Sequence, residues 1–338
     1  MLHPKIKQLL QVALSLGIAL WIFWFLYRDL EFAQLQAQLA SSNWFWILLS
    51  LGIAWAGYWL RGWRWALLFR QEAEQLPVTS NRAYHAVMVG YLVNLLIPRA
   101  GEVARCSVLT RNNGVPIGQA IGTVLVERSV DLLFLAGTIF IAFLLESQLF
   151  IALAGELINL SAISTSLLEK GPQLLGGGIV FVFVLYLLGR KYRSHSFINK
   201  MQLFIRQLLS GVRAIGHLKN PAGFWLSSVA IWIIYFLTMY TVSQGIEAAA
   251  NLSGSQVLLV VVMGTIGMIA PVQGGIGTFH ALVAYILMVF GVPEADGKIF
   301  AAIIHGTQML LVLGLGLISW ILLLNPPPLE KTFNSLNS

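Results

Sequence analysis

Charged side chains interrupt one of the most apolar stretches of the sequence. Glu127, Arg128 and Asp131 lie in an apolar run that starts near Ile117 and continues to Leu145. Ionised groups inside a membrane span are costly, and they usually face the protein interior or water. On a helix, Arg128 and Asp131 are one turn apart, so an ion pair between them forms easily. Two interpretations stay open: an ion pair that locks helices together, or charged groups that line or gate a path for a polar solute.

Two further segments, residues 94–105 and 267–278, predict helices that break inside an apolar stretch. Each has an apolar approach, a P-x-x-G pattern and a new helical start, and Pro98 and Pro271 lie about half the chain apart. Many transporters contain internal repeats whose paired broken helices form the central site. The sequence therefore favours an internal repeat.

Both breaks carry residues suited to binding an anion. The candidates are Asn94, Arg99, Glu102 and Arg105 at the first break, and Gln273, Gly274, Gly275 and Gly277 at the second. Guanidinium groups match the geometry of phosphate. Glycines let backbone N–H groups converge at a helix start, where the positive end of the helix dipole lies. We expect Glu102 to orient one of the arginines or to bind an amine.

The same residues also have structural interpretations. Gly275 and Gly277 can serve only to let helices pack closely. Arg99 and Arg105 can be positive charges at the cytoplasmic interface, where such charges set topology. The sequence alone leaves both alternatives open.

The composition places these motifs in a membrane protein. Of the 338 residues, 57% are apolar and 10% are charged, whereas a soluble domain has about 25% charged residues. The mean hydropathy is +0.78. The net charge of +7 lies in short connecting segments, where bases are typical topology signals and headgroup contacts. We therefore expect no nucleic-acid partner.

Cysteine and histidine usage predicts no metal site and no cofactor. Cys106 is the only cysteine, which excludes an internal disulfide and a multi-cysteine metal site. The six histidines, which show no metal-ligand spacing, are His3, His85, His195, His217, His280 and His305. His305, with Gln308 one turn later, is a candidate for lining a cavity.

The apolar stretches predict an all-α, polytopic integral membrane protein. Because about twenty apolar residues span a bilayer, the candidate stretches are 9–27, 44–60, 83–98, 117–145, 173–189, 222–244, 255–270, 276–292 and 298–324. We expect about eight spanning helices plus re-entrant or broken ones. Aromatic residues crowd several ends, as in an interfacial belt. Arg61 and Arg64, next to Trp63 and Trp65, are interpreted as part of that belt rather than as a binding site.

The connecting segments predict the orientation. Segments 61–82 and 190–219 are basic, whereas 28–43 and 146–170 are acidic. The positive-inside rule puts the basic segments and the N-terminus in the cytoplasm. This orientation is consistent only if 83–98 enters the membrane and returns to the same side. The run that ends at Tyr27 is too long for a signal peptide and no A-x-A site follows it, so we expect it to be the first span.

We expect one membrane domain over residues 1–325, with halves of about 1–170 and 171–325, and a short disordered tail over 326–338. Residues 197–217 predict a basic amphipathic helix on the inner leaflet, or else an ordinary hairpin helix.

Three motifs, taken in order, resemble those of a known family. They are the segment from Asn94 to Arg105, V-E-R-x-x-D from Val126 to Asp131, and P-x-x-G-G-x-G from Pro271 to Gly277. Together they resemble the lysylphosphatidylglycerol synthase transmembrane, or flippase-like, family, which includes the membrane half of the multiple peptide resistance factor. One departure is that Arg99 follows Pro98 directly. The resemblance covers residues 5–325 and implies two pseudo-symmetric halves that move lipids between leaflets.

The resemblance and the motifs predict a flippase or transporter for an anionic or phosphate-bearing lipid, such as a phospholipid, polyprenyl lipid or glycolipid, in the plasma or inner membrane. Arg99 and Arg105 would hold the phosphate and Glu102 would position them. Backbone donors at 274–277 would assist, and Glu127, Arg128 and Asp131 would line the path. No Walker A motif is present, so a gradient, a partner or passive equilibration would supply the movement.

Two other functions stay open. One is a membrane enzyme acting on a lipid phosphate, which would need an acid–base or metal constellation that the sequence does not show. The other is a non-catalytic membrane partner of a separate lipid-modifying synthase. The protein partners that stay open are such a synthase and further copies of the same chain. Full-length relatives carry a soluble aminoacyl-transferring domain, and this chain ends soon after its last predicted span, so we expect no aminoacyl transfer.

Overall fold

The computed structural model describes residues 4–30, 32–70, 78–149, 206, 209–270 and 272–324. These residues form helices and no strand, which confirms the all-α prediction. The elements are α1 (Pro4–Tyr27), α2 (Phe32–Ser41), α3 (Trp44–Leu67), α4 (Ser80–Leu96), α5 (Gly101–Asn113), α6 (Ile117–Leu145), α11 (Pro221–Gly245), η1 (Glu247–Ala249), α12 (Gly254–Ile269), η2 (Gln273–Gly275), α13 (Thr278–Val289) and α14 (Glu294–Leu324).

Several sequence predictions fall outside the described residues. They are the span at 173–189, most of the amphipathic segment 197–217, the acidic segment from residue 150 to 170, Pro271 and the tail 326–338.

Helices long and apolar enough to cross a membrane confirm the membrane assignment. Within the described ranges, α6, α11 and α14 meet this criterion, and α2 with α3, bent by 81°, form a fourth candidate. Large apolar side chains on these helices point outward; Leu226 is 70% exposed and Ile321 is 65% exposed. A chain with such a surface is integral to a membrane, because water would not solvate so much apolar area. The full number of spans stays a prediction.

The first predicted break is an antiparallel helical hairpin made of α4 and α5. Gly101 N–H donates to Asn94 Oδ1 over 2.7 Å, and Gly90 lies against Gly101 and Arg105. A Cβ on Gly101 would lie 2.0 Å from the Gly90 carbonyl oxygen, so only glycine permits this approach. Asn94 therefore supplies the acceptor that the start of α5 needs, and the chain turns back on itself.

The second break forms a similar hairpin from α12, η2 and α13. Thr278 Oγ1 donates to the Gly267 carbonyl over 2.7 Å, and Gly267 and Gly264 both pack against Phe279. Ser253 and Gln256 form a capping box at the start of α12. Each predicted break is thus a turn between two packed helices.

The two hairpins meet at their tips. Gln273 Nε2 donates to the Leu96 carbonyl over 2.7 Å, and Arg99 Nη2 donates to the Ile269 carbonyl over 3.1 Å. Segments about half the chain apart are therefore in direct contact, as paired broken helices require. The division into two repeated halves stays a prediction.

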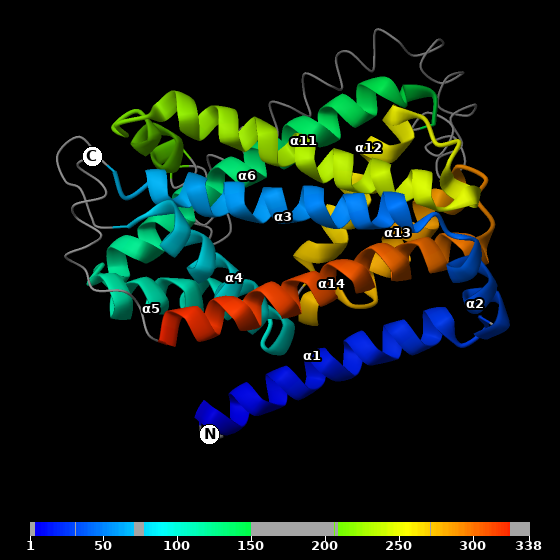
Figure 1. Cartoon of the computed structure of the whole chain (residues 1–338), viewed down its shortest axis with the longest axis horizontal. Coiled ribbons are helices and arrows are strands. Elements are labelled where there is room, and N and C mark those ends of the chain that lie inside the picture. The colour runs from blue at the N-terminus through cyan, green and yellow to red at the C-terminus, as the bar shows by residue number, and fades with distance from the viewer. Residues whose placement is uncertain are drawn as a thin grey trace, which may run out of the picture.

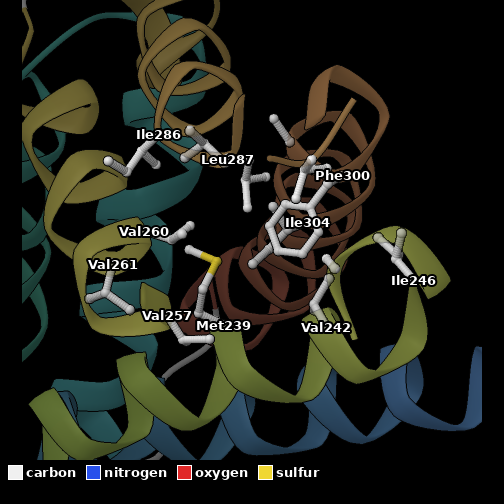
Figure 2. Packing of buried hydrophobic residues seen from close by; sticks show 14 of the residues in the cluster. Met239, Val242, Ile246, Val257, Val260, Val261, Ile286, Leu287, Phe300 and Ile304 are labelled. Atoms are coloured by element: carbon white, nitrogen blue, oxygen red, sulfur yellow. The ribbon is translucent and has the colours of Figure 1, made fainter. Parts of the chain in front are cut away.

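Longer helices enclose the hairpins. Figure 1 shows α3 alongside α11, α14 crossing toward α4, and α1 at the outer edge near α13. One hydrophobic cluster joins α11, α12, α13 and α14 and includes Met239, Val260, Leu287 and Ile304 (Figure 2). A second joins α3, α4, α5, α6 and α11 around Trp65. The charged residues of the sequence motifs lie beside this second cluster.

Candidate functional site

A buried cluster of charges is assembled from three helices. Arg61 and Arg64 lie one turn apart on α3, Glu127 and Asp131 lie one turn apart on α6, and Arg105 lies on α5. Residues three or four apart on a helix share a face, so both pairs point toward each other across the α3–α6 contact. We call these five residues the arginine cluster.

Each carboxylate of the cluster joins more than one guanidinium. Glu127 accepts from Arg61 Nη2 at 2.8 Å and from Arg105 Nη1 at 3.0 Å, and it lies 3.5 Å from Arg64 Nη2. Asp131 accepts from Arg61 Nη2 at 3.0 Å and from Arg64 Nη2 at 2.7 Å. Glu127 and Arg64 are fully buried. Buried charges persist only when paired and hydrogen-bonded, which explains this shared arrangement.

Polar and aromatic side chains complete the cluster. Tyr235 Oη accepts from Arg61 Nη1, and Ser228 Oγ accepts from Arg64 Nη1 at 3.1 Å, both from α11. The Arg105 guanidinium lies 4.5 Å from the centroid of the Trp65 ring, a cation–π distance. The cluster therefore ties α3, α5, α6 and α11 together.

A second ion pair forms the exposed edge of the cluster. Arg128 Nε lies 2.5 Å from Glu102 Oε1, and their side chains are 43% and 40% exposed. Arg128 Nη1 also lies 3.7 Å from Asp131 Oδ2, which places the pair next to the buried charges. This edge gives the cluster a face that an incoming charged group can reach.

The cluster and its edge have more positive than negative groups. Four guanidinium groups face three carboxylates, which leaves one positive charge in a largely buried place. Among the described residues, Arg105 Nη2, and the Nε atoms of Arg61, Arg64 and Arg105, are buried without a hydrogen-bond partner. Buried guanidinium N–H groups are costly to leave unpaired, so the arrangement favours an additional anionic acceptor.

Comparison with known proteins gives the family. The model of the lysylphosphatidylglycerol synthase TM region matches residues 12–316. The chain belongs to this family. A UPF0104 membrane protein of Methanothermobacter thermautotrophicus is 22% identical over 279 residues, which cover 75% of each chain. No solved structure matches.

Several predicted residues of this family member come together, and one interpretation is wrong. Glu102, Arg105, Glu127, Arg128 and Asp131 do lie in one region. Arg61 and Arg64, interpreted as interfacial anchors, are instead 7% and 0% exposed and belong to the cluster. Their one-turn spacing, which matches the spacing of Glu127 and Asp131 on another helix, was the signal for this pairing.

The expected partnership of Arg99, Arg105 and Glu102 is also wrong. Glu102 pairs with Arg128 rather than with either of these arginines. Arg105 is buried against Glu127, whereas Arg99 lies at the hairpin tip with a backbone φ of 62°. Arg99 and Arg105 thus lie in different parts of the structure, because α5 begins between them and turns the Arg105 side chain inward.

The glycine break is less open to an anion than expected. The Gly277 N–H donates to His280 Nδ1 at 3.2 Å, and the Gly275 N–H donates to the Val272 carbonyl at 3.4 Å. A Cβ on Gly277 would lie 2.8 Å from Ile22 of α1. Close packing therefore explains Gly277, and its N–H group already has a partner.

Beside the hairpin tips lies an apolar groove of about 590 Å³. It is lined by Ile22, Ile266, Ile269, Ala281 and Leu282, with Arg99 as its charged residue. The volume falls in the range of about 300–1,000 Å³ that small-molecule sites occupy. The groove thus combines apolar walls with a cation.

Proposed function

We propose that the protein moves an anionic or phosphate-bearing lipid between the leaflets of its membrane, and that the arginine cluster binds the headgroup. The observation that carries this proposal is the excess of buried guanidinium over carboxylate, together with the buried N–H groups of Arg105 that have no partner. A phosphate oxygen accepts charge-assisted bonds from such donors with short, strong geometry. Arg128 and Glu102 form the exposed edge through which the headgroup enters.

The groove beside Arg99 suits the apolar part of the same ligand. Its walls are aliphatic, and Arg99 adds one positive charge to them. A lipid satisfies both features, since it joins an anionic group to long apolar chains, whereas a free inorganic anion has no use for the groove. In this proposal the protein is not an enzyme, lies in the plasma or inner membrane and has a cytoplasmic N-terminus.

The family description, a transmembrane region of a synthase, favours one alternative, in which the chain is a non-catalytic partner of a separate lipid-modifying synthase. The arginine cluster would then only hold α3, α5, α6 and α11 together. This alternative predicts no lipid movement by the purified chain.

The test is lipid movement in reconstituted vesicles. Purified protein is placed in liposomes with trace fluorescent anionic or zwitterionic lipid, and the fraction accessible to an external quencher is followed. Wild type is compared with Arg105→Gln and with Arg111→Gln, which alters an exposed arginine on the same helix. The thermal stability of each variant is measured in parallel.

We expect wild type and Arg111→Gln to speed movement of the anionic lipid. Arg105→Gln should slow it about tenfold or more, because a hydrogen bond to a charged group contributes about 1.5–3 kcal/mol. Glu127 keeps Arg61 and Arg64 in this variant, so the fold should persist. Unchanged movement in a stable Arg105→Gln protein would refute headgroup binding by the cluster. No movement by wild type, even under a proton or sodium gradient, would favour the synthase partner.

A further inference from the structure

Two buried histidines hold the glycine break between them. His280, on α13, and His305, on α14, are 4% and 5% exposed, and their Nε2 and Nδ1 atoms are 3.4 Å apart. His280 Nδ1 contacts the Gly277 N–H at 3.2 Å, and His305 Nε2 contacts the Gly274 carbonyl at 2.8 Å. Both ends of the segment Gly274–Gly277, whose three glycines have positive φ, are therefore bound to one imidazole pair.

These three hydrogen bonds permit only one placement of the protons. The Gly277 N–H can only donate, so His280 Nδ1 is an acceptor and the His280 proton lies on Nε2. His280 Nε2 then donates to His305 Nδ1, which leaves the His305 proton on Nε2. That proton is donated to the Gly274 carbonyl, which can only accept. The whole chain of bonds runs in one direction and requires both rings to be neutral.

One added proton removes at least one of these bonds. Protonation of His280 at Nδ1 turns the acceptor of the Gly277 N–H into a donor, so two N–H groups face each other. Protonation of His305 at Nδ1 does the same to the contact between the rings. We propose that His280 and His305 form a proton-binding site, and that taking up one proton releases the Gly274–Gly277 break from α13 and α14.

The surroundings of the pair contain few other ionisable groups. From α1, Tyr27 lies 5.7 Å from the His280 ring, and its hydroxyl donates to the Lys298 carbonyl. On α14, Lys298 Nζ pairs with Glu294 at 2.6 Å, and α12 carries no ionisable side chain. From the other hairpin, Arg99 bonds the Ile269 carbonyl. Within the described residues, the two imidazoles are thus the groups placed to accept a proton at the break.

One hydrogen bond joins the helix that carries His305 to the helix that carries Arg61. Gln308 lies one turn after His305 on α14, and Tyr58 Oη donates to Gln308 Oε1 at 2.9 Å. Tyr58 lies on α3 one turn before Arg61. The bond therefore lies one helical turn from the histidine pair on α14 and one turn from the arginine cluster on α3. A role of the proton in lipid movement rests on the proposed function, whereas the proton site itself does not.

The test measures protonation and opening of the break without measuring transport. The imidazole ¹⁵N resonances of the full chain in detergent are followed between pH about 8 and about 3.5, a range wider than the one over which an exposed histidine normally titrates. The variants His280→Asn and His305→Gln assign the signals. They also replace each imidazole by a side chain that cannot take up a proton: the Asn oxygen can accept a hydrogen bond at the Nδ1 position, and the Gln amide can donate one at the Nε2 position. His85→Gln, which alters a histidine bonded to Ser319 elsewhere, is the matched control.

Opening is read from thiol labelling. Val272→Cys is introduced with Cys106→Ser, and its labelling rate is divided by that of Asn251→Cys, an exposed site, so that the intrinsic pH dependence of thiol chemistry cancels. We expect this ratio to rise as the pH falls, by up to about tenfold per pH unit, the limit for one proton. The rise should persist in His85→Gln and vanish in His280→Asn and in His305→Gln.

The proposal is overturned if neither the His280 nor the His305 signal titrates, or if the labelling ratio rises equally in all three histidine variants. A misfolded His280→Asn protein leaves the test intact, because His305→Gln and the wild-type titration still decide it. Failure of the vesicle assay leaves these measurements unaffected, so the two proposals can fail separately.

Discussion

Replacing Glu127 by Gln should destabilise the protein more than any other single change in the arginine cluster. Glu127 is the carboxylate that Arg105 pairs with, and it also contacts Arg61 at 2.8 Å and Arg64 at 3.5 Å. With a neutral amide at position 127, Asp131 is the only carboxylate left for the largely buried guanidinium groups of Arg61, Arg64 and Arg105. Removing one partner of a buried ion pair costs about 3–5 kcal/mol, and we expect a loss in the free energy of unfolding of that size.

Asp131→Asn provides the graded comparison. In that variant Arg61 and Arg64 both keep Glu127, and the Asp131 side chain is 16% exposed. Because each buried arginine retains a carboxylate, we expect a smaller loss of about 1–3 kcal/mol, the cost of an unmade buried hydrogen bond.

The double variant Glu127→Gln/Arg105→Gln tests the electrostatic origin of the loss. It removes both the carboxylate and the guanidinium that depends on it, so its loss should be smaller than the sum of the single losses by about 0.5–3 kcal/mol. The assay is denaturant unfolding in detergent micelles, followed by tryptophan fluorescence. Strict additivity, or a Glu127→Gln protein within about 0.5 kcal/mol of wild type, would refute the assignment of Glu127 as the centre of the cluster.

Two further predictions concern the first hairpin. Gly101→Ala should destabilise the protein clearly, because its Cβ would lie 2.0 Å from the Gly90 carbonyl oxygen. Gly118→Ala is the control and should cost little stability, because its Cβ meets open space. Thermal unfolding of the two variants checks this, and an equal loss of stability in both would contradict the tight approach of Gly101 to Gly90. Arg99→Gly should be more stable than Arg99→Ala by about 1 kcal/mol. Both variants lose the hydrogen bond to the Ile269 carbonyl, but the left-handed φ of 62° is strained for alanine and not for glycine. The free energies of unfolding of the two variants test this, and a more stable alanine variant would contradict it.

The sequence by itself determined the class of the molecule and the places where its helices break. The low charge content and the long apolar stretches predict membrane helices because a bilayer tolerates few other backbone structures. The two P-x-x-G segments mark real turns, since helices α4 and α12 end there. Glu127, Arg128 and Asp131 were found because charge inside an apolar stretch is costly enough to require a partner.

Only the tertiary structure decided which partners these charges have. Arg61 and Arg64 look like interfacial residues beside their tryptophans, and the choice between surface and interior depends on the packing of α3 against α6 and α11. Glu102 meets Arg128 rather than its neighbours in sequence, because α5 places it on the exposed side of the cluster. The pairing of His280 with His305 likewise has no local pattern. The local sequence determines which groups need a partner. Contacts between helices that are distant in the sequence determine which partner each group has.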